Sequence, residues 1–357
     1  MAGSDTARHA QGPSGTARGG GDTLHVAVLG GGRSSEHDVS LASAGAVREA
    51  LLEAGHEVQR IEIGRDGVWR RDGAGELSLS PGRGLGGADV AFPVLHGPFG
   101  EDGTLQGALE TLDVPYVGAG VAASAVCMDK VLFKDLMGAL GVPQVRYAGI
   151  VAARWREDRD GALADATALG LPVFVKPAHL GSSVGIARVT RAEDLPGALA
   201  VAFEHDDRAI VEAAAPGIEV ECGVLERLDG GGVTRLLASE PGEISLDRDF
   251  YDYEAKYSAG GMELVVPARV SASARERVRE LAVRAFRASG CAGLARVDFF
   301  VDGELVLLNE LNTIPGFTPT SVYPKLLAAS GVAYPELVDG LCRVALARHA
   351  AQSARRH

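Results

Sequence analysis

The chain has 357 residues, of which 46% are hydrophobic and 23% are charged, and its formal net charge at pH 7 is −12. This composition is typical of a globular protein, and the length suits two or three domains of ordinary size or one large domain. The acidic balance argues against a nucleic-acid partner. No apolar run approaches the length of a membrane-spanning helix, so no membrane contact is expected either.

Residues 1–23 are expected to form a mobile tail. They consist mainly of Gly, Ala, Ser, Thr and Arg, and they contain no apolar stretch of the kind that a secretory signal needs. The cysteines lie far apart in the sequence, without the C-x-x-C spacing of a metal or redox site. We therefore expect reduced and packed thiols in a cytoplasmic protein. The cysteines are Cys127, Cys222, Cys291 and Cys342.

Residues 24–120 are predicted to form a parallel α/β unit. The apolar run LHVAVLG at 24–30 ends in glycine and indicates a buried strand, and the helical pattern after it ends at Gly55. Two further strands follow, HEVQRIEI and DVAFPVLHG. The alternation of strand, helix and strand favours a parallel sheet.

Two more α/β units are expected, over residues 121–213 and 214–350. In the first of these, Asp129 is predicted to cap the helix KVLFKDLMGAL, and Thr190 with Glu193 is predicted to form a capping box for a later helix. The second begins with the alternating strand IEVECGVLE. It then has the strong helical pattern ARERVRELAVRAFRASG, a strand hairpin and a C-terminal helix.

Two glycine-rich loops follow predicted strands of the first unit. GGGRSSEH, at 30–37, places Glu36 near a helix N-terminus, where a carboxylate would repel a phosphate but suit an ammonium group. LHGPFGEDG, at 95–103, contains His96. Ligands of open α/β sheets bind outside the carboxyl ends of the strands, where both loops lie. An ordinary turn would explain the glycines of either loop, but it explains His96 less well.

A third loop, VKPAHLGSSVG at 175–185, resembles a phosphate-binding loop. Lys176 closes a predicted strand, and glycines with the hydroxyl groups of Ser182 and Ser183 follow it. The residue order is not the G-x-x-x-x-G-K-[ST] motif of a P-loop. A plain hairpin loop would also account for the glycines.

The predicted hairpin at 294–312 has the residues of a metal site. Period 2 places Arg296 and Asp298 on one face of its first strand, and Glu310 and Asn312 on one face of its second. A simple two-residue turn would put the two sets on opposite faces, so we predict a bulge or an odd-length loop. If the faces agree, two carboxylates and an amide oxygen form a site for Mg²⁺ that bridges phosphates. Polar residues that face solvent are the alternative.

Lysine is rare in this chain, with five lysines among 35 basic residues. Three of them, Lys130, Lys176 and Lys256, lie in separate motifs, the last within YDYEAKYSAGG at 251–261. A compact ammonium group can approach one phosphate oxygen where the wide guanidinium group would not fit. These lysines are therefore candidate phosphate ligands.

Six motifs, in order and spacing, resemble the D-alanine–D-alanine ligases of the ATP-grasp superfamily, from about residue 25 to 345. They are GGRSSEHDVSL, LHGPFGEDGTLQGALE, the MDK helix, VKPAHLGSSVGI, FYDYEAKY and NELNTIPGFTPTS. The resemblance implies a three-domain ATP-grasp fold of the α/β (α+β) class with an N-terminal parallel sheet. It also implies ATP-dependent ligation of two D-alanines to D-alanyl-D-alanine, through a D-alanyl phosphate, for peptidoglycan biosynthesis.

The resemblance further implies roles in substrate binding and catalysis. Glu36 would bind the ammonium group of the first D-alanine, and Arg296 would stabilise the transferred phosphoryl group and the tetrahedral oxyanion. The residues implied in catalysis are Glu36, Ser182, Tyr257 and Arg296. The residues implied in amino-acid binding are His96 for the first D-alanine and Ser321 and Val322 for the second.

For the nucleotide, the resemblance implies that the three lysines contact phosphates, with Lys256 in a lid that closes over the substrates. Glu212 and the backbone through Ala215 would meet the adenine, and Glu219 the ribose. The full set of implied ATP-binding residues is Lys130, Lys176, Ser183, Glu212, Ala215, Glu219 and Lys256. Two Mg²⁺ ions, for which Mn²⁺ can substitute, would be held by Asp298, Glu310 and Asn312. A homodimer is also expected.

Three alternatives stay open at this point. The family includes ligases that use D-serine or D-lactate as the second substrate, although the presence of Tyr257 favours D-alanine in the same comparison. A nucleotide-binding module without catalysis is disfavoured because every mapped catalytic position is filled. A dinucleotide-dependent oxidoreductase would need the G-x-G-x-x-G fingerprint, which VAVLGGG lacks.

Overall fold

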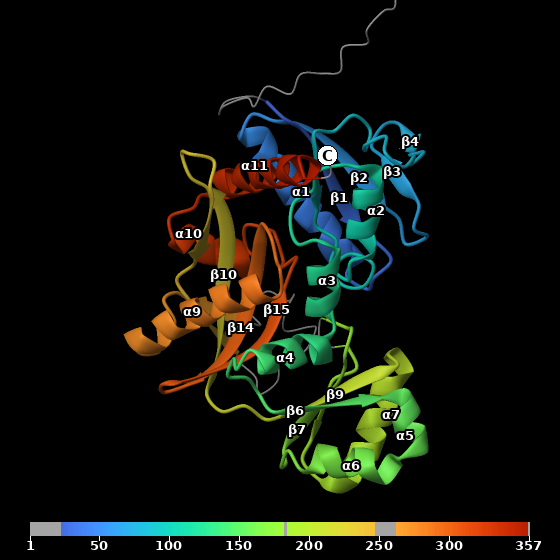
Figure 1. Ribbon diagram of the computed structural model, residues 1–357, viewed down its shortest axis with the longest axis vertical. Coiled ribbons are helices and arrows are strands. Elements are labelled where there is room, and N and C mark those ends of the chain that lie inside the picture. Colours follow the sequence, from blue (N-terminus) through green and yellow to red (C-terminus); the bar gives the residue numbers. More distant parts are fainter. Residues whose placement is uncertain (1–22, 182–183, 247–261, 356–357) are drawn as a thin grey trace, which may run out of the picture.

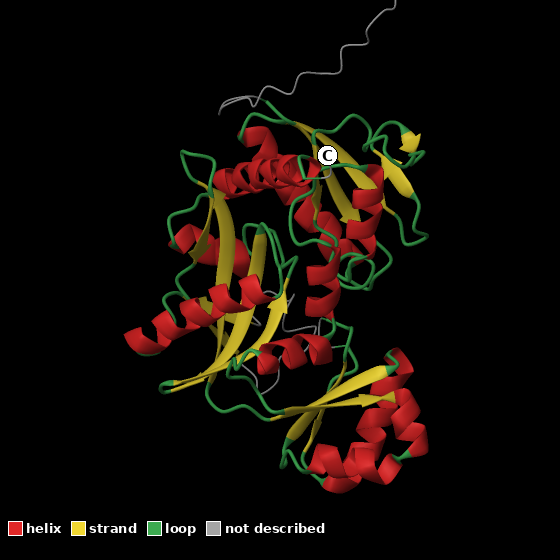
Figure 2. Ribbon diagram, in the orientation of Figure 1, coloured by secondary structure: helices red, strands yellow, loops and turns green. Residues whose placement is uncertain are grey.

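The computed structural model describes residues 23–181, 184–246 and 262–355, and these form three β-sheets with helices packed against them (Figures 1 and 2). The sheets follow one another along the chain. Figure 1 shows the first and second sheets toward opposite ends of the long axis, with the third sheet between them along that axis.

The first sheet has the strand order β4-β3-β2-β1-β5. Strand β1 is parallel to β2 and β5, whereas β3 and β4 add an antiparallel edge. Alternate residues of β1 pack on opposite sides, Val26 in one hydrophobic cluster with α1 and Ala27 in another with α2. Gly55, with φ +90°, follows α1 as predicted. The elements are β1 (His25–Gly31), α1 (His37–Glu53), β2 (Glu57–Ile63), β3 (Trp69–Arg71), β4 (Gly75–Glu76), β5 (Val90–Pro93) and α2 (Thr104–Leu112).

The second sheet is antiparallel and has the strand order β6-β9-β7-β8. Helices α5, α6 and α7 lie beside it (Figure 1), and its own hydrophobic cluster fills the space between. The elements from the end of the first sheet onward are α3 (Val121–Met128), α4 (Lys130–Ala139), β6 (Tyr147–Val151), α5 (Ala152–Glu157), α6 (Arg159–Thr167), β7 (Val173–Pro177), β8 (Ala187–Val189), α7 (Leu195–His205) and β9 (Arg208–Ala213).

One of the two predicted helix caps is confirmed and the other is wrong. Asp129 caps α4, since its Oδ1 accepts hydrogen bonds from the backbone N–H groups of the second and third helical residues, at 2.9 and 3.1 Å. The predicted capping box of Thr190 and Glu193 does not start α7. A 3₁₀ turn at Ala192–Asp194 precedes that helix. The N-cap residue of the 3₁₀ turn is Arg191 and that of α7 is Asp194, and neither side chain makes a capping hydrogen bond.

The third sheet is antiparallel, with the order β13-β12-β10-β14-β15 and with β11 paired to β10. Helix α9 packs in one hydrophobic cluster with β10, β14 and β15, whereas α10 and α11 belong to another. The elements are β10 (Ile218–Leu228), β11 (Thr234–Ala238), β12 (Gly242–Leu246), β13 (Met262–Val265), α9 (Ala272–Ala288), β14 (Leu294–Asp302), β15 (Leu305–Asn312), α10 (Val322–Ala329) and α11 (Tyr334–Ser353).

Helix α11, near the C-terminus, packs against elements of both the first and the third sheet. It packs against α1 and β5 of the first sheet as well as against β10 of the third (Figure 1). Its Asp339 Oδ1 lies 2.8 Å from Nε2 of His56, a buried residue directly before β2. The first and third sheets therefore share one hydrophobic cluster.

The hairpin of β14 and β15 contains the predicted irregularity. Asp298 pairs with Glu310, but the next residue, Phe299, pairs with Leu308, so Asn309 is the extra residue of a β-bulge. The prediction is confirmed: the register shift puts the polar residues of both strands on the same face.

The four cysteines are free and buried, as expected. Among the described residues, no helix combines the length and the apolar character that crossing a bilayer requires.

Candidate active site

The carboxylate of Glu36 lies where three loops meet. Glu36 directly precedes α1 and is 8% exposed. A Cβ atom added to Gly97, whose φ is +76°, would lie 2.8 Å from Glu36 Oε2, and one added to Gly181 would lie 3.8 Å from the same oxygen. The loop after β1, the loop after β5 and the start of the glycine-serine loop therefore converge on one buried carboxylate.

His96 joins the loop after β5 to the segment that follows β15. Its Nδ1 lies 3.0 Å from the carbonyl oxygen of Ile314, and its Nε2 lies 3.1 Å from Ser43 Oγ. Burial disfavours the charged ring, but the carboxylates of Glu101, 3.8 Å away, and Glu36 outweigh it, so the pKa of His96 lies above its usual value. The buried His96 ring and the buried Glu36 carboxylate therefore lie within electrostatic influence of each other.

Glu212, in β9, lies between two ammonium groups. Its Oε1 is 2.8 Å from Lys134 Nζ, and its Oε2 is 2.7 Å from Lys176 Nζ. Glu212 is 3% exposed and Lys134 is 2% exposed. Burial alone would raise the pKa of Glu212, but the two lysines outweigh it and hold that pKa well below its usual value.

Lys176 connects this ion cluster to the bulged hairpin. Burial disfavours its charged form, but the carboxylates of Glu212, Glu310 and Glu219 outweigh burial and raise the pKa of Lys176. Glu212 belongs to β9 of the second sheet, whereas Glu310 and Glu219 belong to β15 and β10 of the third. Carboxylates from these two sheets therefore act on one lysine side chain. The candidate nucleotide residues and the candidate metal residues therefore form one region.

Lys130 holds the glycine-serine loop from the start of α4. Its Nζ donates to the carbonyl oxygen of Leu180 at 2.6 Å, and its backbone N–H donates to the carbonyl oxygen of Ala178 at 3.1 Å. Ala215 lies in the short segment between β9 and β10.

Arg296, in β14, is enclosed by carboxylates. Its Nε lies 2.8 Å from Asp298 Oδ1 and 2.9 Å from Glu221 Oε2, and its Nη2 lies 2.7 Å from Asp298 Oδ2. Asn312 Nδ2 donates to Asp298 Oδ2 at 3.0 Å. Burial disfavours the charged guanidinium group, but Asp298, Glu221 and Glu310 outweigh it and keep the pKa of Arg296 well above its usual value.

Ser321 is the N-cap residue of α10, and Val322 is the first residue of that helix. Ser321 Oγ accepts from the backbone N–H of Thr318 at 3.1 Å and lies 2.8 Å from Thr318 Oγ1. The side chain of Val322 is 8% exposed and packs in the core. Its backbone N–H, in the first helical turn, is therefore the group that it can present to a ligand.

The structure thus brings most of the predicted site residues together in two groups. Glu36 and His96 form the first, and the second consists of Lys176, Glu212, Glu219, Arg296, Asp298, Glu310 and Asn312. The other described candidates lie on other segments: Lys130 begins α4 and contacts the glycine-serine loop, Ala215 lies between β9 and β10, and Ser321 and Val322 lie at the start of α10. Four predicted residues lie outside the described part of the chain: Ser182, Ser183, Lys256 and Tyr257.

Two residues that contact the second group, Lys134 through Glu212 and Glu221 through Arg296, were missed by the sequence analysis. Each had a signal. Lys134 is one of the five lysines and follows Lys130 by one helical turn, and Glu221 alternates with Glu219 on the same face of β10.

Family models match most of the chain. The model described as D-ala D-ala ligase N-terminus matches residues 25–83 and 73–119, and the one described as D-ala D-ala ligase C-terminus matches residues 136–343. A D-alanine–D-alanine ligase of Deinococcus radiodurans is 47% identical over 339 residues, which cover 90% of this chain and 98% of that protein.

Solved structures agree. The D-alanine–D-alanine ligase of Coxiella burnetii superposes with a TM-score of 0.80 at 34% identity, covering 94% of this chain and 98% of that one. The VanG D-Ala:D-Ser ligase of Enterococcus faecalis gives a TM-score of 0.79 at 34% identity, covering 91% and 100%.

This fold, with its cationic and acidic side chains gathered between two antiparallel sheets, defines an ATP-grasp ligase. The chain belongs to the D-alanine–D-alanine ligase family, whose reaction is the ATP-dependent joining of two D-alanines for peptidoglycan synthesis. The predicted fold class, family and enzyme class are therefore confirmed.

Proposed function

We propose that the protein makes D-alanyl-D-alanine in two steps at this site. The carboxylate of the first D-alanine attacks the γ-phosphorus of ATP, which gives a D-alanyl phosphate and ADP. The neutral amine of the second D-alanine then attacks the acyl carbon, and the tetrahedral intermediate expels phosphate. The main support is that the Glu310 carboxylate interacts electrostatically with both Lys176 and Arg296. One carboxylate therefore lies near both the lysine proposed to bind a phosphate of ATP and the arginine proposed to stabilise the acyl intermediate.

The first D-alanine is held by Glu36 and His96. The buried Glu36 carboxylate pairs with the substrate ammonium group, and the buried His96 ring, whose pKa the nearby carboxylates raise, orients the substrate carboxylate for attack. By resemblance, Ser182 and Tyr257 complete this group. A buried carboxylate suits an ammonium group better than a phosphate.

ATP lies along the second group of residues. Lys130 and Lys176 contact its α- and β-phosphates, Glu212 and the backbone through Ala215 meet the adenine, and Glu219 meets the ribose. By resemblance, Ser183 and Lys256 contact the phosphates as well, Lys256 from a lid that excludes water from the acyl phosphate. Lys176 suits this role because its raised pKa keeps it charged.

Arg296 stabilises the negative charge that develops on the transferred phosphoryl group and later on the tetrahedral oxyanion. Its carboxylate partners fix its position before substrate arrives, so little reorganisation accompanies the reaction. Ser321 and the backbone N–H of Val322, at the N-terminus of α10, receive the carboxylate of the second D-alanine.

Two Mg²⁺ ions fit the donor set of Asp298, Glu310 and Asn312. Two carboxylates and an amide are hard oxygen ligands, and the bulge places them on one face of the hairpin. Mg²⁺, or Mn²⁺ in its place, would supply positive charge that offsets the negative charge of the phosphates.

ATP is a cytoplasmic metabolite, so the cytoplasm is the proposed location of the protein. A homodimer is the proposed assembly.

The Gly97→Ala substitution is expected to raise KM for the first D-alanine about tenfold and to lower the free energy of unfolding by about 1 kcal/mol or more. Alanine is strained at φ +76°, and its methyl group would lie 2.8 Å from Glu36 Oε2, which must move. Steady-state kinetics and urea unfolding measure the two effects. Gly107→Ala in α2, where an added Cβ meets nothing within 4 Å, is the control and should leave KM unchanged.

The proposed reaction is tested by ADP release with Mg²⁺-ATP and D-alanine, beside reactions with L-alanine alone, D-alanine plus D-serine, and D-alanine plus D-lactate. Turnover with D-alanine alone and not with L-alanine is expected, with D-alanyl-D-alanine as the product by mass spectrometry. Preferential formation of D-alanyl-D-serine over D-alanyl-D-alanine would indicate a specificity like that of the similar D-Ala:D-Ser ligase. ATP binding without turnover on any of these substrates would refute the proposal.

A further inference from the structure

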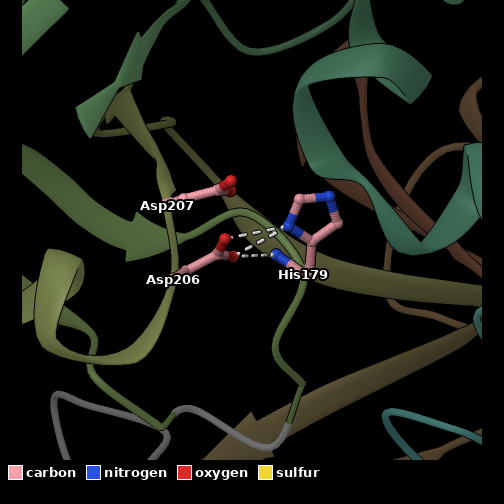
Figure 3. Close-up of side chains that lie close together, drawn as sticks. All are labelled: His179, Asp206 and Asp207. Carbon is pink, nitrogen blue, oxygen red and sulfur yellow. Dashed lines mark hydrogen bonds and ion pairs between the residues drawn. The ribbon is translucent and has the colours of Figure 1, made fainter. Parts of the chain in front are cut away.

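His179, at the start of the glycine-serine loop, contacts two carboxylates, those of Asp206 and Asp129. Figure 3 shows its contacts with Asp206. Its Nδ1 lies 3.0 Å from both oxygens of Asp206, and its Nε2 lies 3.2 Å from Asp129 Oδ2. Its backbone N–H also donates to Asp206 Oδ2 at 2.7 Å. One residue is therefore tied by its ring and by its main chain to two acidic side chains from different segments.

These contacts join three elements at the base of the loop. Asp129 is the N-cap residue of α4, which begins with Lys130, and Asp206 lies two residues before β9. Arg208, the first residue of β9, completes the cluster, with its Nη1 2.5 Å from Asp129 Oδ2. Since Lys130 Nζ binds the carbonyl oxygen of the residue after His179, the cluster lies one residue from a proposed phosphate contact.

A metal ion is one alternative for this cluster. The ligand atoms of His179, Asp206 and Asp207 lie within 4.8 Å of one another (Figure 3). The hydrogen bonds favour a proton instead, because each ring nitrogen faces a carboxylate. A neutral imidazole has one donor and one acceptor, so it would turn a lone pair toward Asp206 or toward Asp129, whereas the imidazolium donates to both.

The electrostatics agree with this geometry. Hydrogen bonds to Asp129 and Asp206 outweigh burial and raise the pKa of His179 to about 10. Burial alone would raise the pKa of both carboxyls, but contact with His179 lowers them. The nearby charges are Asp129 on α4, Asp206 and Asp207 before β9, and Arg208 on β9.

We propose that His179, as an imidazolium, is a positioning residue that fixes the described start of the glycine-serine loop, up to residue 181, for ATP binding. It ties the start of the loop to the N-cap of α4 and to the start of β9, and it neutralises two carboxylates that would otherwise repel the triphosphate. This inference rests on the proposed function, because it is that function which assigns Lys130 and the loop to ATP.

The His179→Gln substitution is expected to raise KM for ATP and Kd for ADP roughly tenfold, the scale of one lost charge-assisted hydrogen bond. KM for D-alanine should change less than twofold. A matched control is His349→Gln, which removes another histidine–aspartate pair, His349 Nε2 to Asp113 Oδ1 at 3.2 Å, and should change none of these constants. His179→Arg, which keeps a cation with several donors, should recover most of the ATP affinity.

Each outcome is decisive. An unchanged KM for ATP in His179→Gln, with wild-type turnover intact, would overturn the inference and leave the proposed function standing. Absence of turnover in the wild type would overturn the proposed function itself. If His179→Gln folds poorly, His179→Arg still tests the proposal, because a folded Arg variant that binds ADP tenfold or more weakly than the wild type would contradict a role for the charge.

Nitrogen NMR of the ring provides a readout in the wild-type protein that needs no variant. Both ring nitrogens of His179 should stay protonated from pH 6 to 9. Loss of one proton near pH 6.5, the usual value for histidine, would contradict the imidazolium. A chemical shift change of the ring on adding Zn²⁺ or Mn²⁺ at micromolar concentration would favour the metal alternative and overturn the proposal.

Discussion

The Arg296→Lys substitution is expected to lower kcat for dipeptide formation by about 10²–10³, with little change in KM for ATP. This factor is the usual cost of removing one preorganised donor from the charge that develops in an acyl-transfer transition state. Lysine keeps the positive charge, but a single ammonium group cannot reproduce the contacts that the guanidinium group makes with Asp298 through two nitrogens and with Glu221.

The effect should fall on kcat because Arg296 is positioned before any substrate binds. Its Nε and Nη2 contact Asp298 and Glu221, so these carboxylates hold the guanidinium group in place before the reacting groups arrive. An interaction that strengthens only as charge develops lowers the barrier without tightening the ground state. Single-turnover kinetics should therefore show slower chemistry after normal ATP binding.

Arg269→Lys is the matched control for this prediction. Arg269 also binds a carboxylate through two nitrogens, Nε at 3.0 Å and Nη2 at 2.6 Å from the oxygens of Glu243, but it has no assigned role in the reaction. Its replacement should leave kcat within twofold of the wild type. An equal loss of kcat in the two variants would mean that Arg296 contributes to the stability of the protein and not to stabilisation of the transition state.

The arrangement of polar residues on the hairpin of β14 and β15 was predictable from the sequence because it depends on local periodicity. Period 2 fixes the face of each residue on a strand, and a mismatch between the two polar sets requires one extra residue. The structure has that residue at Asn309. The position of the bulge, beside Asp298 rather than in the turn, could not be predicted, since either place restores the same parity.

The ion cluster of Lys134, Glu212 and Lys176 was only partly predictable. Glu212 and Lys176 lie on adjacent strands, β9 and β7, whose pairing depends on the whole sheet. Lys134 comes from α4, and its burial depends on how that helix packs against the sheets. A rare lysine one turn after Lys130 indicated a site, but not a carboxylate partner 78 residues away.

The wrong capping box shows the limit of short motifs. The sequence around Thr190 and Glu193 fits the pattern, but Pro196 lies in the first turn of α7 and needs no N–H partner. Arg191 binds Asp194 instead, with its Nε 2.9 Å from Oδ2. Competing side-chain contacts of this kind are visible only once the backbone is known. The domain boundaries near residues 120 and 213 stay predictions.

The Glu212→Gln substitution is expected to lower the free energy of unfolding by about 3–5 kcal/mol, the cost of removing one partner from a buried ion pair. The cluster of Lys134, Glu212 and Lys176 has two cations and one anion. Loss of the anion leaves Lys134, which is 2% exposed, and Lys176, whose side chain is 17% exposed, as neighbouring like charges, 2.8 and 2.7 Å from an amide. Lys134→Met leaves a balanced pair of Glu212 and Lys176, so it should cost only about 1 kcal/mol.

The pH dependence of unfolding tests the same charge balance independently. The pKa of Glu212 is depressed in the folded protein, so its contribution is present above the unfolded value of about 4.3 and is lost as pH falls below it. Stability should therefore fall less steeply below pH 4.3 in Glu212→Gln than in the wild type. Glu243→Gln, whose partner Arg269 has a 61% exposed side chain, is the control and should cost far less. Equal losses for Glu212→Gln and Lys134→Met would show that packing, and not the single shared anion, determines the stability of this cluster.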